Sequence, residues 1–315
     1  MKYIEFYKKN NISEQDVFNY FINNMRSSIK VWDYFVNWNK VNNNLSKIDV
    51  ELNILNSLIG KDNFDNAFKE LLTKYPSIIK ALPILLAVRD NKLEILKDYK
   101  KGDLTYLEFD FTEKTNLTEQ EITKYLEYMT KSGLKELFLN KKVKNFVDYV
   151  LGVEVGLDSN GRKNRGGKLM EEIVEVFVKK TINENPHLEY ISQATPTRIK
   201  KLWNFNINFE KSARSYDFAI YNKETKKIFL IETNFYNGGG SKLKSVCGEF
   251  KSLFNELKKQ NIELIWITDG KGWESAKRPL EETFNNNNYV FNLDAIDKNI
   301  LKEILLKNVK REKLK

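Results

Sequence analysis

The chain has 315 residues, of which 41% are hydrophobic and 13% aromatic, so it can bury the core of one large domain or two ordinary ones. Its 52 Lys and Arg residues outnumber its 43 Asp and Glu residues, and the formal net charge of +9 favours a polyanionic partner without identifying it. One cysteine, Cys247, and one histidine, His187, exclude an internal disulfide framework, a Cys-based zinc site and a His-rich metal centre.

These counts leave carboxylates, lysines and a hard metal ion as the groups on which any catalysis is expected to rest. The opening run MKYIEFYKKN carries charges where a signal peptide needs an apolar segment. No stretch approaches the roughly 18 apolar residues of a membrane helix. The sequence therefore predicts a cytoplasmic protein with no membrane partner.

The first half of the chain carries apolar residues at helical spacing from Ser13 onward. Pro76 and Pro83 divide its middle into short helices, because an interior proline removes a donor and clashes with the preceding turn. The alternating run YLEFDF, residues 106–111, predicts one strand at a sheet edge. We therefore predict a mostly helical region over residues 1–150.

A different organisation begins near Gly152, where a Gly- and charge-rich loop at residues 156–168 leads into an amphipathic helix. The predicted elements are a helix at 167–180, strands at 216–222 and 227–236, a helix near 242–259, a strand at 263–269, a helix near 273–285 and a short strand. This order predicts an α/β (α+β) fold over residues 151–315, with a mixed β-sheet flanked by helices. Four tryptophans are expected in the core rather than on a binding surface: Trp32, Trp38, Trp203 and Trp266.

Two acidic residues stand out in the predicted strands. Asp217 lies early in one run and Glu232 late in the next, so a hairpin connection would bring their carboxylates to adjacent positions. Neighbouring carboxylates repel when they are buried, and a divalent cation such as Mg²⁺ is the simplest compensation. The alternative is that both acids only make salt bridges, to Arg214 and to a lysine across the sheet.

Two further segments carry candidate groups. Glu171, in the first turns of the predicted helix at 167–180, could bring a third carboxylate to the metal, or could simply be favourable charge near a helix N-terminus. A glycine run precedes Ser241 and Lys242, and its backbone amides with Lys242 could approach a phosphate at a helix start. The alternative there is a plain loop.

Three runs of the sequence, GLDSNGRKNRGGKLMEEIVE, YDFAIYN and KIFLIETNFYNGGGSKLKS, resemble the core of the DpnII/MboI type II restriction endonucleases. The runs YFVNWNKV, ELNILNSLIGK, YPSIIKALPILLAVRD and LIWITDGKGW resemble the same family outside that core, so the resemblance covers most of the chain. It implies a PD-(D/E)XK nuclease fold.

In that superfamily an acid on one strand and an acid-x-lysine on the next form the metal site. Asp217 corresponds to the first acid and Glu232 to the second, whereas Asn234 stands where lysine is usual. An asparagine cannot supply positive charge, although its amide can orient the attacking water. Lys242 is the candidate for the missing charge.

The resemblance further implies Mg²⁺-dependent hydrolysis of double-stranded DNA at GATC, on the 5′ side of the G. It implies blockage by adenine methylation, which a cognate adenine methyltransferase would supply. A palindromic site suits a homodimer, and the helical half could dimerise or clasp DNA. Candidate DNA contacts, of the residue types that read bases or bind phosphates, are Arg162, Lys163, Asn164, Arg165, Arg198 and Ser241.

Two alternatives stay open from the sequence. One is a repair or structure-specific nuclease of the same fold. The other is a sequence-specific DNA-binding protein whose metal site is degenerate, which the asparagine at position 234 leaves possible.

Overall fold

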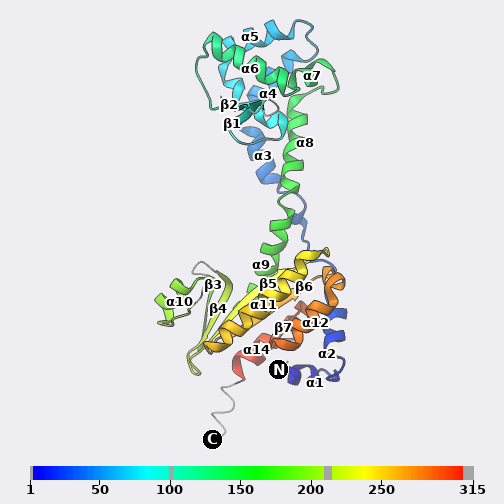
Figure 1. Cartoon of the computed structure of the whole chain (residues 1–315), viewed down its shortest axis with the longest axis vertical. Coiled ribbons are helices and arrows are strands. Elements are labelled where there is room, and N and C mark those ends of the chain that lie inside the picture. Colours follow the sequence, from blue (N-terminus) through cyan, green and yellow to red (C-terminus); the bar gives the residue numbers. More distant parts are fainter. Residues whose placement is uncertain (1–2, 99–102, 209–214, 308–315) are drawn as a thin grey trace. The chain divides into compact units, whose positions relative to one another are not determined.

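The computed structural model describes residues 3–98, 103–208 and 215–307. The chain forms two compact units, one of residues 1–31 with 163–315 and the other of residues 32–162. They are called the sheet unit and the helical unit below. Figure 1 shows the elements of both, coloured along the sequence.

The sheet unit contains five strands in the order β3-β4-β5-β6-β7. Their bounds are β3 Leu188–Ala194, β4 Tyr216–Asn222, β5 Lys227–Phe235, β6 Glu263–Asp269 and β7 Tyr289–Phe291. The pairs β3-β4 and β4-β5 are antiparallel, whereas β5-β6 and β6-β7 are parallel. The predicted mixed sheet is therefore confirmed.

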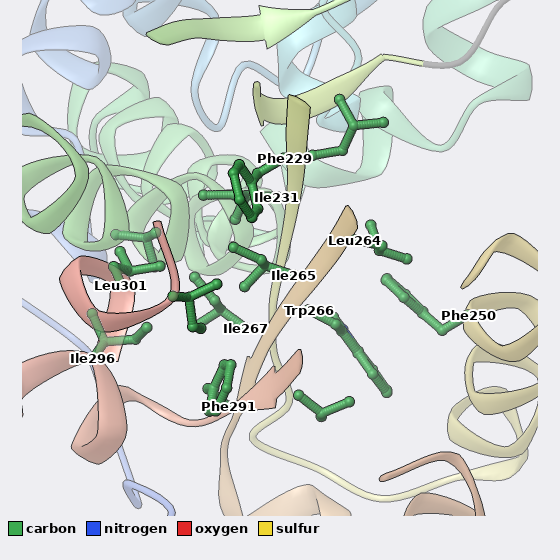
Figure 2. Close-up of a cluster of buried hydrophobic side chains, with 14 of the residues drawn as sticks. Phe229, Ile231, Phe250, Leu264, Ile265, Trp266, Ile267, Phe291, Ile296 and Leu301 are labelled. Atoms are coloured by element: carbon green, nitrogen blue, oxygen red, sulfur yellow. The ribbon is translucent and has the colours of Figure 1, made fainter. Parts of the chain in front are cut away.

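Helices cover both faces of this sheet, because strands β5 and β6 are apolar on both sides. On one face Trp266 of β6 stacks on Phe250 at 4.1 Å between ring centroids, and Phe250 belongs to α11 (Ser241–Lys259). Figure 2 shows Ile265 and Ile267 on the other side of β6, toward Ile296 and Leu301. Ile296 belongs to α13 (Leu293–Asp297) and Leu301 to α14 (Ile300–Leu306).

The remaining helical elements of the sheet unit are α1 Ile4–Lys9, α2 Val17–Asn23, α9 Arg162–Asn183, α10 Pro196–Trp203, η5 Lys271–Ala276 and α12 Lys277–Asn286. Met170, Val174 and Val178 of α9 are fully buried in the core of the sheet unit. Their spacing gives α9 one apolar face, as the sequence predicted for this helix.

The first 31 residues belong with the sheet, so the unit boundary differs from the predicted one at residue 150. Phe21 of α2 packs against Phe284 of α12 with 4.7 Å between ring centroids, and Phe6 of α1 is buried in the same core. Helical periodicity indicates that a segment buries one face, but not which core receives that face. The helical unit also continues to Arg162, beyond the predicted end.

The helical unit has its own core, in which Phe64, Phe68, Phe111, Phe138 and Phe146 are almost completely buried. Its helices are α3 Trp38–Ser46, α4 Asp49–Leu55, α5 Phe64–Lys74, α6 Glu119–Lys131, α7 Leu134–Leu139 and α8 Phe146–Ser159. Short 3-10 turns lie at η1 Trp32–Tyr34, η2 Asn56–Leu58, η3 Pro76–Ala81 and η4 Pro83–Leu86. The two prolines thus begin short turns, as their effect on helices predicted.

A hairpin completes the helical unit. Strands β1 (Lys92–Asp98) and β2 (Asp103–Asp110) pair antiparallel as a two-stranded sheet. The predicted strand at 106–111 falls largely within β2, which is an edge because its sheet has only two strands.

The loop predicted at residues 156–168 is wrong for most of its length. Helix α8 continues to Ser159 and α9 begins at Arg162, so Gly156, Gly166 and Gly167 lie inside helices. An interior glycine costs a helix roughly 1 kcal/mol, which packing of the buried helix faces can offset.

The expectation that four tryptophans are core residues holds only in part. Trp266 is 1% exposed and Trp203 is partly buried, but Trp32 is 92% exposed and Trp38 is 56% exposed. Trp32 lies in the short η1 turn, which has no buried residue, and Trp38 is the first residue of α3, whose one buried residue is Val41. Hydrophobicity alone therefore misplaced Trp32 and Trp38.

No helix in the described ranges of the chain combines the length and the apolarity needed to cross a membrane.

Candidate active site

Asp217 lies at the start of β4, beside the end of β5. Phe218 pairs with Ile231 in the antiparallel register, so Asp217 and Glu232 are the next positions on the two strands. The Oδ2 atom of Asp217 accepts hydrogen bonds from the backbone N and from Oγ1 of Thr233, each at 2.7 Å. The Asp217 carboxylate is thereby fixed to β5 at the residue that follows Glu232.

Glu171 of α9 is the second acid close to Asp217. Burial raises the pKa of the Glu171 carboxyl above its ordinary value, and the neighbouring charge of Asp217 raises it further. Nε2 of Gln193 donates to Oε2 of Glu171 at 2.9 Å and lowers that pKa in part. Glu172 instead pairs with Lys168 at 3.6 Å along the helix, which fits a surface charge near the start of α9.

Asn234 has a fixed amide orientation. Nε1 of Trp266 donates to Oδ1 of Asn234 at 2.7 Å. An indole N–H can only donate, so the bound amide atom must be the oxygen, and the NH₂ group is the end left to act as a donor. Trp266 is itself held by its stack on Phe250 and by an edge contact with Trp273 at 5.7 Å between ring centroids. Asn234 can therefore orient a substrate oxygen or a water by donating to it.

The glycine run leads directly into α11, where Ser241 and Lys242 form an exposed first turn. The glycine run packs closely against Gly272, where no side chain would fit. A Cβ at position 272 would lie 2.5 Å from the carbonyl oxygen of Gly238 and 2.7 Å from that of Tyr236. Among the described residues, no hydrogen bond or ion pair joins Lys242 to the carboxylates of the site. The catalytic role of Lys242 stays a prediction.

The predicted DNA contacts lie in several environments. Nε of Arg162 donates to the carbonyl oxygen of Phe35 at 3.0 Å. Nη1 of Arg198 donates to the carbonyls of Ser192 and Gln193, at 2.6 and 2.8 Å. Both guanidinium groups are thus partly used in holding backbone segments.

Three other predicted contacts, Lys163, Asn164 and Arg165, lie in the first turn of α9, and Ser241 begins α11. Asn164 is exposed and Arg165 is half-buried. The Lys163 side chain lies outside the described residues, as does Arg214, the salt-bridge partner considered for the acids. A role in DNA binding stays a prediction for each of these residues.

Three side chains that hold the site were not predicted: Thr233, Gln193 and Trp266. Side chains alternate along a strand, so the Thr233 hydroxyl is expected on the face of the sheet opposite to Glu232. Its hydrogen bond to Asp217 depends on where β4 begins, which the sequence does not give. The sequence carries no signal for the Gln193 contact, which joins residues 22 positions apart.

The donor set of the site suits a hard cation. No group of three or more His, Cys, Asp or Glu side chains able to hold a metal occurs within residues 3–98, 103–208 and 215–307. The negative charge of Asp217 nevertheless repels that of Glu171, and a divalent cation would relieve this repulsion. Carboxylate oxygens are also the ligands that Mg²⁺ prefers. The residues present therefore fit such an ion.

Comparison with known proteins gives close relatives over nearly the whole chain. The profile of the family described as DpnII restriction endonuclease matches residues 17–303. The chain is 50% identical over 290 residues to the type II restriction enzyme MjaIII of Methanocaldococcus jannaschii, covering 91% of this chain and 99% of MjaIII. It is 38% identical over 295 residues to DpnII of Streptococcus pneumoniae, with 91% and 98% covered. It is 34% identical over 277 residues to MboI of Moraxella bovis, with 88% and 92% covered.

Proposed function

The chain belongs to the DpnII family of type II restriction endonucleases, and from this premise we propose that it cuts unmethylated double-stranded DNA at GATC, on the 5′ side of the G. Its relatives are type II restriction enzymes, which are site-specific endonucleases that bind double-stranded DNA. One observation supports the proposed chemistry: Asp217 and Glu171 lie close together beside the end of β5.

Type II restriction enzymes generally need a divalent metal ion, and we propose Mg²⁺ here, held by Asp217 and Glu232 with Glu171 beside them. When bound, Mg²⁺ polarises the scissile phosphodiester and lowers the pKa of the attacking water. Thr233 keeps the Asp217 carboxylate in one orientation through its two hydrogen bonds.

Asn234 and the first turn of α11 would then act on the substrate. The Asn234 amide, oriented by Trp266, would donate to the attacking water or to a phosphate oxygen. The backbone amides at the start of α11 and the Lys242 ammonium would bind the phosphate, since helix N-termini favour anions. Lys242 would supply the positive charge that Asn234 lacks.

DNA recognition is proposed to involve two copies of the chain. A homodimer would match the two-fold symmetry of GATC, with each subunit cutting one strand. The helical unit would dimerise or clasp the DNA. Residues of the types that contact bases and phosphates would border the duplex, namely Arg162, Lys163, Asn164, Arg165, Arg198 and Ser241.

The cellular setting follows from the same proposal. A cognate adenine methyltransferase would protect the host's own GATC sites. The buried thiol of Cys247 has no second cysteine with which to form an internal disulfide, which suits the reducing cytoplasm where host DNA lies.

The proposal is tested by digesting one plasmid, prepared with and without adenine methylation at GATC, in Mg²⁺ or in chelator. The wild-type protein should give discrete GATC fragments only from the unmethylated plasmid with Mg²⁺. Asp217→Ala should abolish cutting. The matched control is Asp297→Ala, since Asp297 is an exposed aspartate whose nearest cation is Arg26 at 4.0 Å, and this variant should cut normally.

Discrete fragments that do not end at GATC would overturn the specificity and keep the endonuclease. Binding of GATC duplexes without metal-dependent cutting by the wild-type protein would overturn the hydrolytic proposal. Equal cutting of the methylated plasmid would contradict the proposed effect of methylation.

A further inference from the structure

We propose that Gln193 is a positioning residue of the active site, which holds the Glu171 carboxylate beside Asp217 so that the two acids can share a divalent cation. The inference rests on the function proposed above and adds to it a residue from β3, the edge strand of the sheet.

The backbone of Gln193 is strained. Its φ angle of +48° lies in the left-handed region, which side chains other than glycine adopt at a cost. Among the described residues, every other non-glycine position with positive φ lies at a turn or at a helix end, whereas Gln193 lies inside a strand. Strain of this kind persists only where the surrounding structure imposes it, and it concentrates at functional sites.

The strand register directs Gln193 to the site. Ser192 pairs with Phe218 and Ala194 pairs with Tyr216, so Gln193 lies across from Asp217. The left-handed backbone changes the direction of the side chain, as the extra residue of a β-bulge does. Its amide then reaches Glu171 on α9.

Helix α10 maintains this conformation. Nη1 of Arg198 donates to the carbonyl oxygens of Ser192 and Gln193, on both sides of the strained residue. Thr195 accepts a hydrogen bond from the backbone N of Arg198 at 3.3 Å and caps the start of the helix. The strain at Gln193 is therefore enforced by two neighbouring contacts.

The chemistry of the contact suits a cation site. Nε2 of Gln193 donates to Oε2 of Glu171 at 2.9 Å, and Oε1 of Glu171 has no hydrogen-bond partner among the described residues. An amide fixes a carboxylate without adding charge, whereas Lys or Arg would neutralise the acid and compete with the cation. Thr233 holds Asp217 in the same way, so two neutral donors orient the two acids.

The test uses Gln193→Gly, which removes the amide and also relaxes the backbone, because glycine adopts positive φ readily. The matched control is Lys226→Gly, which relaxes an exposed left-handed residue, φ +56°, in the turn between β4 and β5. Mn²⁺ binding is followed by electron paramagnetic resonance in the complex with a GATC duplex that carries an uncleavable phosphorothioate. Cleavage rates with Mg²⁺ and melting temperatures are measured in parallel.

Q193G should weaken Mn²⁺ binding and slow cleavage by roughly 10–100-fold, the usual effect of losing a group that orients a metal ligand. Its melting temperature should be unchanged or higher. K226G should keep wild-type Mn²⁺ affinity and rate. In an E171Q background, Q193G should cause no further loss, because its effect acts through Glu171.

Wild-type Mn²⁺ affinity in Q193G would overturn the inference and leave the proposed function intact. A Q193G protein that loses stability together with affinity would assign Gln193 a purely structural role and would also overturn it. A wild-type protein that neither binds Mn²⁺ nor cuts DNA would overturn the proposed function itself, and the inference with it.

Discussion

Three polar side chains at the site accept a hydrogen bond from a donor that carries no charge. Thr233 holds Asp217, Gln193 holds Glu171, and the Trp266 indole holds Asn234. Neutral donors fix the geometry of the acids without adding positive charge that would compete with a cation.

Trp266→Phe should test whether the orientation of Asn234 matters. Phenylalanine keeps an aromatic ring to stack on Phe250 but cannot donate to Asn234, so the amide becomes free to rotate. We expect cleavage to slow roughly 10-fold with little change in DNA affinity, as for loss of a group that orients a reactive one. In single-turnover kinetics the effect should vanish in an Asn234→Ala background.

The control for this variant is Trp273→Phe. Nε1 of Trp273 donates to Oγ1 of Thr268 at 2.8 Å, and within the described part of the chain no hydrogen bond joins it to an acid of the site. Phenylalanine keeps an aromatic ring to contact Trp266. This variant should lose stability, about 1 kcal/mol for the hydrogen bond, yet keep its rate. Equal rates for Trp266→Phe and the wild type would show that the Trp266 bond only satisfies a buried indole.

The pair of acids was accessible to sequence reasoning, and their supports were not. Asp217 and Glu232 interrupt apolar runs, where a carboxylate needs a reason to be present. Gln193 and Trp266 have no such signature, since a glutamine in a polar strand end and a tryptophan in an apolar run are both ordinary. Their roles depend on strand register and on one left-handed residue, which only three-dimensional structure gives.

At the level of elements, the glycine run before α11 is fixed by close backbone packing against η5. The N of Gly272 donates to the carbonyl oxygen of Tyr236 at 2.8 Å, and the N of Tyr236 donates to that of Asp269 at 2.9 Å. These contacts tie the ends of β5 and β6 together at the edge that carries the site.

Gly272→Ala should therefore disturb both stability and activity. Its Cβ would meet backbone atoms of Gly238 and Tyr236 closer than any ordinary contact, so the glycine run must shift. We expect a loss of about 1–3 kcal/mol in the free energy of unfolding, typical of overpacking, and slower cleavage. Gly248→Ala is the control, because it lies within α11 with open space around it and should stabilise the helix by about 0.5–1 kcal/mol.

Helix α6 of the helical unit begins with a capping box that makes its stability depend on pH. Thr118 accepts from the backbone N of Glu121 at 3.2 Å, and the Glu121 carboxylate accepts from the backbone N of Thr118 at 2.8 Å. The ion-paired hydrogen bond from Lys114 and then the Thr118 N–H lower the pKa of Glu121 to about 2. A depressed carboxyl pKa stabilises the folded state above the ordinary glutamate pKa, and this contribution disappears as pH falls toward 2.

Glu121→Gln should consequently lower the melting temperature at neutral pH and make a smaller difference at about pH 3. That pH lies between the ordinary glutamate pKa and the folded-state pKa of about 2, where the contribution of the ionised carboxylate declines. Solvent screening limits the effect to about 1 kcal/mol or less, because the Glu121 side chain is 34% exposed. Glu127→Gln, which removes an exposed pair with Lys131 on the same helix, should change little at either pH. Equal losses for both variants at neutral pH would contradict the special role of the cap.

Periodicity predicted which helices and strands exist. It did not predict where they begin and end or which elements they pack against. The apolar runs around Leu230 and Ile265 predicted β5 and β6, because few other structures bury such short continuous runs. The glycines at 156, 166 and 167 misled the prediction, since tertiary packing overrides their low helix propensity.

On the scale of the whole molecule, the helical unit is one continuous segment that both leaves and rejoins the sheet unit. Its two ends are joined to each other, because Arg162 donates to the carbonyl oxygen of Phe35 and the N of Asn37 donates to Asp158 at 2.9 Å. Of the residues that the structure describes, none from the sheet unit belongs to its core.

The proposed homodimer gives a prediction at this scale. Sedimentation equilibrium should return a mass about twice the 37.1 kDa of the chain when the protein binds a GATC duplex, after subtraction of the DNA. A mass of one chain per duplex, together with cleavage of both strands, would contradict the two-subunit arrangement.

Because the sheet unit is formed by two separate parts of the chain, the two units cannot fold in the same order as they are translated. Helices α1 and α2 are made before the helical unit, yet Phe21 packs against Phe284, which is translated after that unit. The helical unit is contiguous, so it can fold while the rest is still being made. Ribosome-stalled chains that end just after β5 have the helical unit clear of the ribosome, and should show it protected from protease with α1 and α2 unprotected. Under the proposed function this order delays cutting, because a nascent chain cannot complete the sheet unit until α12 has emerged.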